Sequence, residues 1–561
     1  MILNLTGVGR VRYASVASLA VLVLSASGCS GGQSSFAPPI ASISTGPVAH
    51  FAGTAQAVLT FTFPDRRTPA SRSRAYVSPS IASLGVAVNG AAATHVNAPP
   101  IGAGRTVTIA IPAPVGNDTF AFAEYDMNDG KGNLLGRTSQ AMTIQASIVN
   151  NLAFTLDGQL AKIVFAPAGT SPFLEVGGTS AAPVYTLVGN LAVPFNVLPE
   201  DADGNVIVTP GALPIVTVAG PSGSPIGSVP GANGTIGLYA SAPTAPVAVT
   251  ATGKDLDGKT ITASLMIGAS AAIYIANYLS QTITAYDESG TALALPSTSF
   301  SGLTNPMGLA YVPSATPGTS GSLVITETAN SSAPYVMEYD QSGGVQVAQN
   351  SAFANTMQPL FPAYAPATGT TPATISLPNY KNSTITQYDA AGNALPIAGG
   401  KFAGLASPVQ IVYDPNNTHY YVTNLGSFNI IQYMVDGTTV GTPVSAGNHP
   451  MGVAYDGNNK HLYVAFSGQV ATVSSSTPSP SGIMEFDESL ATISTSGQFT
   501  NTNPTTASYI GILFDPFNKQ LYVTDAGDNA VVAFTEAGAA VTLPTGAFAK
   551  LNDPMSLAIV P

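Results

Sequence analysis

The chain ends in DPMSLAIVP (553–561), a short strand opened by a polar residue and a proline, and related stretches occur five times upstream. Each of these continues into a second strand like LYVTD (521–525) and a third like AVVAFT (530–535). The earliest second strand, IYIAN (273–277), has no first strand of this kind before it. The repeat is therefore out of phase with its ends. Pairing of the last strand with the first segment would leave no unpaired sheet edge.

Six units align over residues 269–561. Their first strands are NPMGLAYVP (305–313), QPLFPAYAP (358–366), SPVQIVYDP (407–415), HPMGVAYDG (449–457), SYIGILFDP (508–516) and DPMSLAIVP (553–561). Alternating apolar and polar residues bounded by Asp, Gly, Asn and Pro are typical of half-buried antiparallel strands. We therefore predict an all-β chain that ends in a six-bladed β-propeller with four strands per unit. The C-terminal strand is expected to pair with the first blade segment.

The units resemble the NHL-repeat family, whose six-bladed propellers share the Pro-x-Gly start, the LYV-Asp second strand and the aromatic end of the third strand. The most similar unit is LYVTDAGDNAVVAFTEAG (521–538), and the other units carry Asn, Glu or Phe where it has Asp525. The resemblance covers about half of the chain and implies the same ring of blades. The chain contains no Trp, which argues against WD-type blades.

The N-terminal residues 1–28 are typical of a secretory signal. Arg10 and Arg12 precede an apolar run over residues 13–24, which is too short for a membrane span. The segment Ala26-Ser27-Gly28-Cys29 resembles a bacterial lipobox, which implies that Cys29 carries a lipid. An ordinary signal peptide with a chance Cys is the alternative. We predict an exported lipoprotein of the bacterial cell envelope, anchored to the outer membrane or exposed on the cell surface.

The part between the signal and the repeats divides by composition and strand pattern. Residues 29–50 are rich in Ser, Gly and Pro and are expected to form a flexible tether. Residues 51–160 contain short alternating stretches that predict a small β-sandwich. Residues 161–268 repeat a strand, Asp-x-Asp-Gly turn, strand pattern that resembles the immunoglobulin-like modules of bacterial surface proteins. We therefore expect two sandwich domains before the propeller.

Charge excludes one class of partner. Residues 269–561 carry five Lys, no Arg and 17 Asp or Glu, a net charge of −12. Nucleic-acid binding depends on Lys and Arg side chains that neutralise phosphates. The RNA-binding use of NHL propellers is therefore not expected. The exception to the acidic balance is a loop that contains Arg66, Arg67, Arg72 and Arg74, which would contact either solvent or anionic lipid headgroups.

The repeat also predicts which polar residues meet. Because the first and second strands of a unit are antiparallel, the residue before each Pro and the last residue of the second strand lie on one face, near the central channel. The expected pairs are Asn305 with Glu327, Gln358 with Asn379, Ser407 with Asn424, His449 with Phe466, Ser508 with Asp525, and Asp553 with Asn277.

These pairs support more than one interpretation. Carboxylate and amide oxygens at a channel mouth suit a hard cation such as Ca²⁺, with Glu327 and Asp525 as the metal ligands. They are similar in kind to the Glu, Asn and Asp ligands of gluconolactonase-like propeller enzymes. Asn and Asp at strand ends equally hold turns by bonding to their own backbone. The turns at 126–133, 201–205 and 255–259 lack the spacing of an EF-hand and are expected to be hairpin turns.

We expect a non-enzymatic, surface-anchored binding or scaffold lipoprotein. Its channel face would bind a small ligand, a glycan or a protein through the polar residues of the pairs. The alternative is a metal-dependent hydrolase of the lactonase kind, with Asn379 and Asn424 beside the metal ligands and with His449 or Asp553 as the proton-transfer group. A third hypothesis is that partners use the outer edges of the blades.

Overall fold

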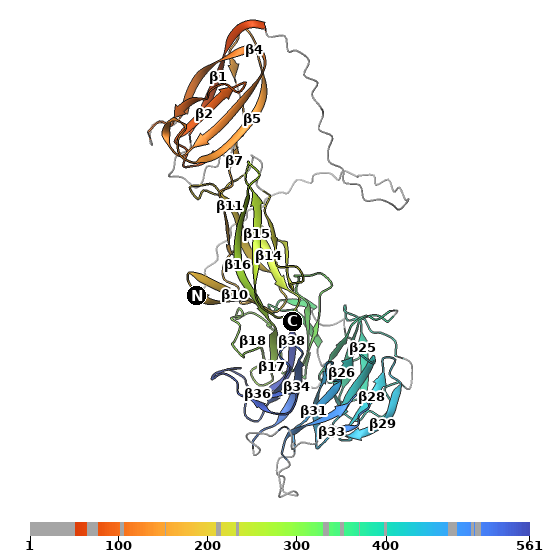
Figure 1. Cartoon of the computed structure of the whole chain (residues 1–561). Helices are drawn as coiled ribbons and strands as arrows, with labels where there is room; N and C mark the ends of the chain where they lie inside the picture. The colour runs from red at the N-terminus through yellow and green to blue at the C-terminus, as the bar shows by residue number, and fades with distance from the viewer. Residues whose placement is uncertain are drawn as a thin grey trace, which may run out of the picture. The chain divides into compact units, whose positions relative to one another are not determined.

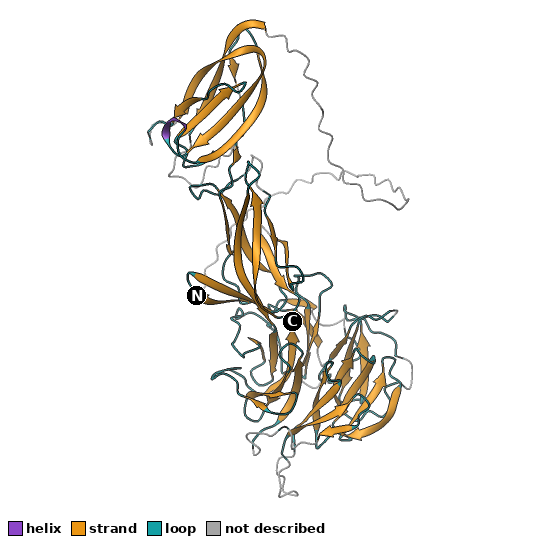
Figure 2. Ribbon diagram, viewed as in Figure 1, coloured by secondary structure: helices purple, strands orange, loops and turns teal. Residues whose placement is uncertain are grey.

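The computed structural model describes residues 51–63, 77–100, 106–151, 153–208, 215–231, 235–328, 336–347, 353–369, 371–397, 401–468, 480–494, 499 and 506–561. Within these ranges the chain is all-β, apart from a single 3₁₀ turn at Asn128–Gly130 (Figure 2). No helix in this part of the chain has the length and apolar character needed to cross a membrane. The predicted fold class is therefore confirmed at the level of secondary structure.

The first group of strands forms one seven-stranded sheet in the order β3-β2-β4-β1-β6, with β5 joining β4 to β7. The strands are β1 (Phe51–Thr62), β2 (Ser83–Val88), β3 (Thr94–Asn97), β4 (Thr106–Tyr125), β5 (Leu134–Ile144), β6 (Asn150–Asn151) and β7 (Asp157–Gly158). The long β4 pairs with both β2 and β5 along its second half. Its inward side chains Phe120 and Phe122 pack with Leu59, Leu84 and Leu135 in one apolar core.

The second group forms two sheets, β12-β15-β16-β10-β9 and β13-β14-β11-β8, around one core. The strands are β8 (Lys162–Pro167), β9 (Leu174–Thr179), β10 (Ala182–Val188), β11 (Val193–Glu200), β12 (Thr217–Ala219), β13 (Ile226–Pro230), β14 (Thr235–Ala240), β15 (Thr244–Lys254) and β16 (Thr260–Ser270). Phe195 and Leu238 from one sheet pack with Leu187, Val249 and Ile267 from the other. Alternate residues of each strand face this core, as expected for sheets packed face to face.

The repeats form six sheets, which we number as units in ring order. Unit 1 is β18-β17-β38, with β17 (Ala272–Asn277), β18 (Thr282–Asp287) and β38 (Pro554–Val560). Unit 2 contains β19 (Pro306–Val312), β20 (Ser322–Glu327), β21 (Val336–Asp340) and β22 (Val345–Val347). Unit 3 contains β23 (Ala363–Ala365), β24 (Thr374–Asn379) and β25 (Thr384–Tyr388).

The remaining three units each have four strands. Unit 4 contains β26 (Pro408–Asp414), β27 (His419–Asn424), β28 (Asn429–Met434) and β29 (Thr439–Ser445). Unit 5 contains β30 (Pro450–Asp456), β31 (His461–Phe466), β32 (Gly482–Asp487) and β33 (Thr492–Ser494). Unit 6 contains β34 (Tyr509–Asp515), β35 (Gln520–Asp525), β36 (Ala530–Thr535) and β37 (Ala540–Val541).

The prediction of four strands in every unit is wrong for units 1 and 3, whose sheets have three strands among the described residues. After β18 and β25 only isolated bridges form, at Ala292 and Ala394. A proline follows shortly after each bridge, at 296 and 396, and proline cannot donate to a strand ladder. Within unit 3 the first strand is reduced to β23 because Pro362 interrupts it.

The ends of the repeat are joined as expected. β38 pairs antiparallel with β17, with Ile273 opposite Ile559 and Ile275 opposite Leu557 (Figure 1). The six first strands contact one another in a closed circle, from β19 through β23, β26, β30 and β34 to β38 and back to β19. The six sheets therefore form a propeller-like ring with no open edge between the first and last units.

An aromatic contact recurs in five units. The Phe that opens the repeat packs on the aromatic ring near the end of the third strand, with ring centroids 5.0–5.8 Å apart in the pairs Phe300–Tyr339, Phe353–Tyr388, Phe402–Tyr433, Phe499–Phe534 and Phe548–Tyr286. The last pair joins residues near the two ends of the repeat. The same packing that builds each unit therefore also spans the closure.

Candidate functional site

The six expected pairs lie at one end of the ring, which we call the proline end because Pro directly follows the first residue of the pair in five units. In every pair the backbone carbonyl of the first residue accepts a hydrogen bond from the N–H that follows the second strand. The N···O distances are 3.2 Å for Asn305, 3.1 Å for Gln358, Ser407 and His449, 2.9 Å for Ser508 and 3.0 Å for Asp553. The sequence-predicted neighbours are therefore brought together at all six positions.

The residues before the prolines have an unusual backbone. Asn305, Gln358, Ser407, His449 and Asp553 have φ angles between 50° and 57°, in the left-handed region. Asn and Asp tolerate this region better than most residues because their short polar side chains bond locally. The backbone turn accounts for the Asn and Asp found at two of these positions, and all six side chains are half-buried.

The residues at the ends of the second strands are buried, and their side-chain oxygens are used within the protein. In five of the six units, one such oxygen accepts a backbone N–H from the turn that leads into the first strand of the same unit. The bonds are Asn552 N to Asn277 Oδ1 (3.1 Å), Thr304 N to Glu327 Oε1 (2.7 Å), Met357 N to Asn379 Oδ1 (2.8 Å), Ala406 N to Asn424 Oδ1 (3.1 Å) and Ser508 N to Asp525 Oδ1 (2.8 Å). The sixth position, Phe466, has no such group. These side chains act as turn caps.

Burial changes the acidity of the carboxyl groups at this end. Desolvation raises the pKa of Glu327 from 4.5 to about 7, although the hydrogen bond from Thr304 opposes the shift. The pKa values of Asp525 and Asp553 are also raised, chiefly by burial. Among the described residues no group of three or more His, Cys, Asp or Glu side chains is arranged to hold a metal ion.

His449 is held by local contacts. Its Nδ1 lies 3.1 Å from the carbonyl oxygen of Gly468, and its ring meets the edge of Phe428 with centroids 5.1 Å apart. The residue opposite it in the pair is the apolar Phe466. His449 therefore has no carboxylate or hydroxyl partner within its own pair for general acid or base chemistry.

The centre of the proline end is apolar. Residues at or just before the starts of the first strands contribute Met307, Leu360, Val409, Met451, Ile510 and Met555, which pack in one hydrophobic cluster with the buried Phe361. Leu360, Val409 and Ile510 are buried, and the three methionines are half-buried. We call these six residues the apolar mouth. Each member follows Pro, or Tyr509 in unit 6, by one position, so the polar residue, the proline and the apolar residue repeat in that order.

Other apolar side chains surround the mouth. Tyr380, Leu425 and Ala526, which directly follow second strands, contact the same cluster. Leu279 and Phe428, in turns after second strands at this end, are 61% and 41% exposed. The sequence reasoning placed a polar ring at the channel and missed this apolar surface, although the recurring apolar residue after each proline was the available signal.

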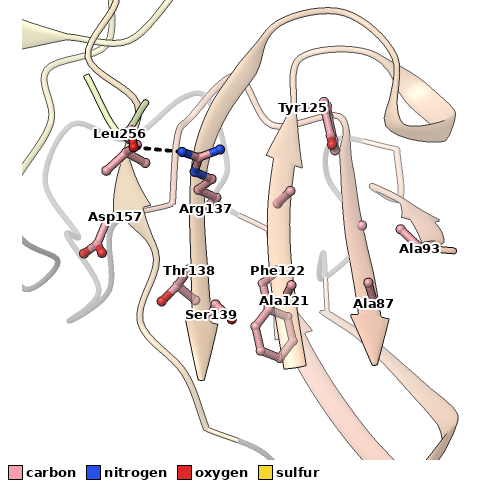
Figure 3. Close-up of a pocket in the computed structure, with 12 residues that line it drawn as sticks. Ala87, Ala93, Ala121, Phe122, Tyr125, Arg137, Thr138, Ser139, Asp157 and Leu256 are labelled. Atoms are coloured by element: carbon pink, nitrogen blue, oxygen red, sulfur yellow. Dashed lines mark hydrogen bonds between the residues drawn. The ribbon is translucent and has the colours of Figure 1, made fainter. Parts of the chain in front are cut away.

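A cavity of about 500 Å³ lies elsewhere, against the sheet of the first group of strands. Its walls are mostly small side chains such as Gly85, Ala121 and Ser139, with Arg137 and Tyr125 beside them (Figure 3). Arg137 donates a hydrogen bond from Nη2 to the backbone oxygen of Leu256 at 2.8 Å. None of the sequence-predicted site residues lines this cavity.

In each of the three Asp-rich turns, the first Asp accepts hydrogen bonds from backbone N–H groups of the same turn. Asp126 accepts the backbone N–H of Asn133 at 2.7 Å, and Asp255 accepts that of Lys259 at 2.8 Å. Asp201 accepts the backbone N–H groups of Asp203 and Asn205. These bonds are those of hairpin turns. Other sequence predictions, namely the signal peptide, Cys29, the tether and the arginines of residues 66–74, lie outside the described residues.

No family model matches the chain, and no curated protein matches it. Solved structures do match. A chain of a nidogen/laminin complex aligns at 16% identity over 52% of this chain and 98% of its own, with a TM-score of 0.38. A "putative 6-phosphogluconolactonase" from Bacteroides fragilis aligns at 15% identity over 52% of this chain and 98% of its own, with a TM-score of 0.35.

A third structure, a protein of unknown function from Bacteroides thetaiotaomicron, aligns at 10% identity over 70% of this chain and 94% of its own, with a TM-score of 0.36. At these scores and identities the similarities carry no argument about function.

Proposed function

We propose that the chain is a non-enzymatic binding lipoprotein of the bacterial cell envelope. Its C-terminal part would be a six-bladed propeller of the NHL-repeat kind, preceded by two β-domains, of which the second is an immunoglobulin-like sandwich. A lipid on Cys29 would anchor it, and the proline end of the ring would bind a partner. The partner class that this end suits best is a protein segment with aromatic or aliphatic side chains.

The apolar mouth is the observation that carries the proposal. Three of its six members are methionines, whose unbranched side chains adapt to differently shaped apolar partners. Aromatic and aliphatic residues around it enlarge the apolar area at the same end. The five polar side chains at the ends of the second strands already each accept a backbone N–H with one oxygen. Apolar contact is therefore the main interaction that this end offers to a partner.

A displayed library of unstructured peptides tests the proposal. We expect the purified chain to enrich peptides that contain aromatic or aliphatic residues. The double variant Met307→Glu/Met451→Glu should lose this enrichment because it places two charges in the mouth. Met434→Glu is the matched control, since Met434 is 47% exposed at the end of β28, outside the mouth. Equal enrichment by the wild type and the double variant would contradict the proposal.

The rival function is a metal-dependent hydrolase of the lactonase kind that uses Glu327 and Asp525. A ligand that binds only the folded state raises the melting temperature. Under our proposal millimolar Ca²⁺, Mg²⁺ or Zn²⁺ leaves the melting temperature of the ring unchanged. A rise that disappears in Glu327→Gln/Asp525→Asn would favour the hydrolase instead.

A further inference from the structure

The opposite end of the ring, where the first strands end, carries three buried aspartates. Asp414, Asp456 and Asp515 are the last residues of β26, β30 and β34, and each is completely buried. In each, Oδ1 accepts the backbone N–H two residues further on, at 2.8–2.9 Å. The other oxygen, Oδ2, has no hydrogen-bond partner in any of the three. An unpaired, buried carboxylate oxygen is costly in free energy.

A glutamate from the next unit in the ring lies towards each aspartate. Glu488, Glu536 and Glu288 each follow the third strand of units 5, 6 and 1, and all three are half-buried. The charge of Asp515 acts on Glu288, that of Glu488 acts on Asp414, and Asp456 and Glu536 are in direct contact. The carboxyl groups therefore lie close enough to interact at three successive interfaces between units, and they touch at the interface between units 5 and 6.

The two acids occur together at every interface where either occurs. The other three first strands end in Val312, Ala365 and Val560, at the positions that match the aspartates. The next units then have Ala390, Val435 and Gln341 in place of the glutamates. An Asp is never present without the Glu, and a Glu is never present without the Asp. This matching indicates that the two carboxyl groups function as a pair.

The interface between units 5 and 6 shows what such a pair requires. The carboxyl groups of Asp456 and Glu536 lie within hydrogen-bonding reach of each other, yet Asp456 Oδ2 and Glu536 Oε1 have no donor. Two carboxylates have no hydrogen to share, whereas a carboxylic acid and a carboxylate do. One proton would therefore satisfy both buried oxygens and remove the repulsion between them.

The interface between units 4 and 5 contains a third group. The hydroxyl of Tyr455 donates to Glu488 Oε1 at 2.7 Å and also lies within hydrogen-bonding reach of Asp414. A phenol has a single hydrogen, so it can serve only one of the two carboxylates at a time. At the interface between units 6 and 1, Glu288 Oε1 accepts the backbone N–H of Ala271 at 2.9 Å, and the charge of Asp515 acts on the same carboxyl group.

We propose that each of these three interfaces holds an Asp–Glu pair that takes up one proton, so that acidification strengthens the contact between neighbouring units of the ring. The pairs are a stabilising device separate from the proline end. They suit a protein that works in an acidic medium.

Other charged and titratable groups face the pairs. Tyr421 lies beside Asp414 and Glu488, and Tyr522 lies beside Asp515 and Glu288. Asp287 adjoins Glu288 and contacts Glu175, so it adds further negative charge.

Among the described residues, cationic side chains act on the pair between units 5 and 6. Lys519 and His461 face Glu536, while the imidazole of His461 is bonded to Glu485 at 2.7 Å. Tyr463 lies beside Asp456 at the same interface. His419 lies opposite Asp414 in the β26–β27 pair, and its Nδ1 lies 2.8 Å from Gln432 Nε2. Among the described residues no Lys or Arg is a cause of the raised pKa values of Asp414, Asp515 or Glu288, so a proton is the simplest way to neutralise these acids.

The direction of the pH effect follows from the burial. Desolvation, together with Asp515 and Asp287, raises the pKa of Glu288 from 4.5 to about 7, and burial also raises the pKa values of Asp414, Asp515 and Glu536. Between pH about 4.5 and about 7 the folded state therefore binds more protons at these carboxyl groups than the unfolded state does. The stability that the groups contribute is fully present below pH about 4.5 and is lost as the pH rises towards 7.

The test compares the full chain with the triple variant Glu288→Gln/Glu488→Gln/Glu536→Gln at pH 4.5 and pH 8, with a chelator present. Gln resembles the protonated acid in shape. We expect the variant to melt at the wild-type temperature at pH 4.5 and at a higher temperature than the wild type at pH 8. If the triple variant does not fold, Glu288→Gln alone serves. Equal changes at the two pH values would overturn the proposal.

Two further measurements separate this idea from its alternatives. Asp389→Asn replaces a half-buried acid in the turn after β25, whose pKa is lowered by bonds from Asn393, and should instead lower the melting temperature at pH 8. Removal of the chelator and addition of millimolar Ca²⁺ at pH 8 should not stabilise the wild type. A Ca²⁺-dependent rise that is absent from the triple variant would mean that the pairs hold a cation and not a proton.

Discussion

Amides and carboxylates occupy equivalent positions at the ends of the second strands. Asn379 and Glu327 both accept a backbone N–H from the turn before the first strand, at 2.8 and 2.7 Å. The amide performs this role without charge, whereas the carboxylate must be buried with its charge or protonated. Asn379 and Glu327 therefore share the same local structure, but burying the carboxyl group of Glu327 has an electrostatic cost that the amide of Asn379 does not have.

This comparison predicts that Glu327→Gln stabilises the chain above neutral pH. The pKa of Glu327 is raised to about 7 by burial, so the folded state loses stability as the pH rises from about 4.5 to 7. Gln keeps the acceptor for Thr304 and removes the titration. We expect a gain on the order of 1 kcal/mol at pH 8 and little change at pH 4.5, measured by chemical denaturation.

Asn379→Ala is the companion variant, because it removes the acceptor without changing charge. It should destabilise the chain by about 1 kcal/mol at both pH values, since the N–H of Met357 loses its partner. A loss of stability at pH 8 on Glu327→Gln would mean that the ionised carboxylate is needed, as a cation site would require.

At the scale of elements, the first strands approach one another closely through glycine. A Cβ on Gly511 would lie 2.4 Å from the backbone oxygen of Met555 in the next unit, and Gly308 and Gly452 are in equivalent positions. The hydroxyl of Thr524 donates to the same oxygen at 3.0 Å. Glycine is therefore required because the backbone of the neighbouring strand occupies the space of a side chain.

Gly511→Ala should consequently separate β34 from β38 and destabilise the ring by about 1–3 kcal/mol. Gly457→Ala is the control, because the nearest atom to its added Cβ would be 3.7 Å away, which is an ordinary contact. Thermal unfolding of the two variants measures the difference. Equal melting temperatures would show that the first strands have room to move apart.

The strands were largely predictable from sequence, while some of their ends were not. The recurring LYVTD-like motif identified β17, β20, β27, β31 and β35, because each is a short apolar run that is buried along almost its whole length. Units 1 and 3 have no outer strand among the described residues. The segment after the third strand alternates only weakly, and the sequence pattern alone does not show whether such a segment pairs with the third strand. The break at Pro362 was visible in the sequence as a proline within a predicted strand.

The candidate site was predictable in position but not in orientation. The six pairs followed from the antiparallel order of two strands, and their backbones meet as expected. Whether a side chain at a strand end faces the channel or its own turn depends on the local φ angle, and the sequence did not show that Asn305 or Asp553 is left-handed. The sequence therefore predicted polar side chains at the centre of the proline end, where the structure has the apolar mouth.

At the scale of the whole molecule, three kinds of contact span the closure of the ring. β38 pairs with β17, Phe548 packs on Tyr286, and the backbone N–H of Leu309 donates to Ser556 Oγ at 3.2 Å. These contacts connect residues that are distant in sequence, so they form only when the entire repeat has folded. We expect the ring to unfold as one cooperative unit.

The central claim is that the C-terminal strand completes the first sheet, and a disulfide tests it directly. Ala276 and Ser556 are small, buried and directly opposite each other on β17 and β38. Antiparallel neighbours have Cα atoms about 4.5–5.5 Å apart, within the range of a disulfide. The measurement is the thermal unfolding of Ala276→Cys/Ser556→Cys, in a Cys29→Ser background, after mild oxidation.

We predict that the oxidised protein has no free thiol and is stabilised by about 2–4 kcal/mol relative to its reduced form, because the bond closes a long loop. Each single-cysteine variant should keep its thiol and its original melting temperature. Persistence of both free thiols in the folded double variant would contradict the closed ring.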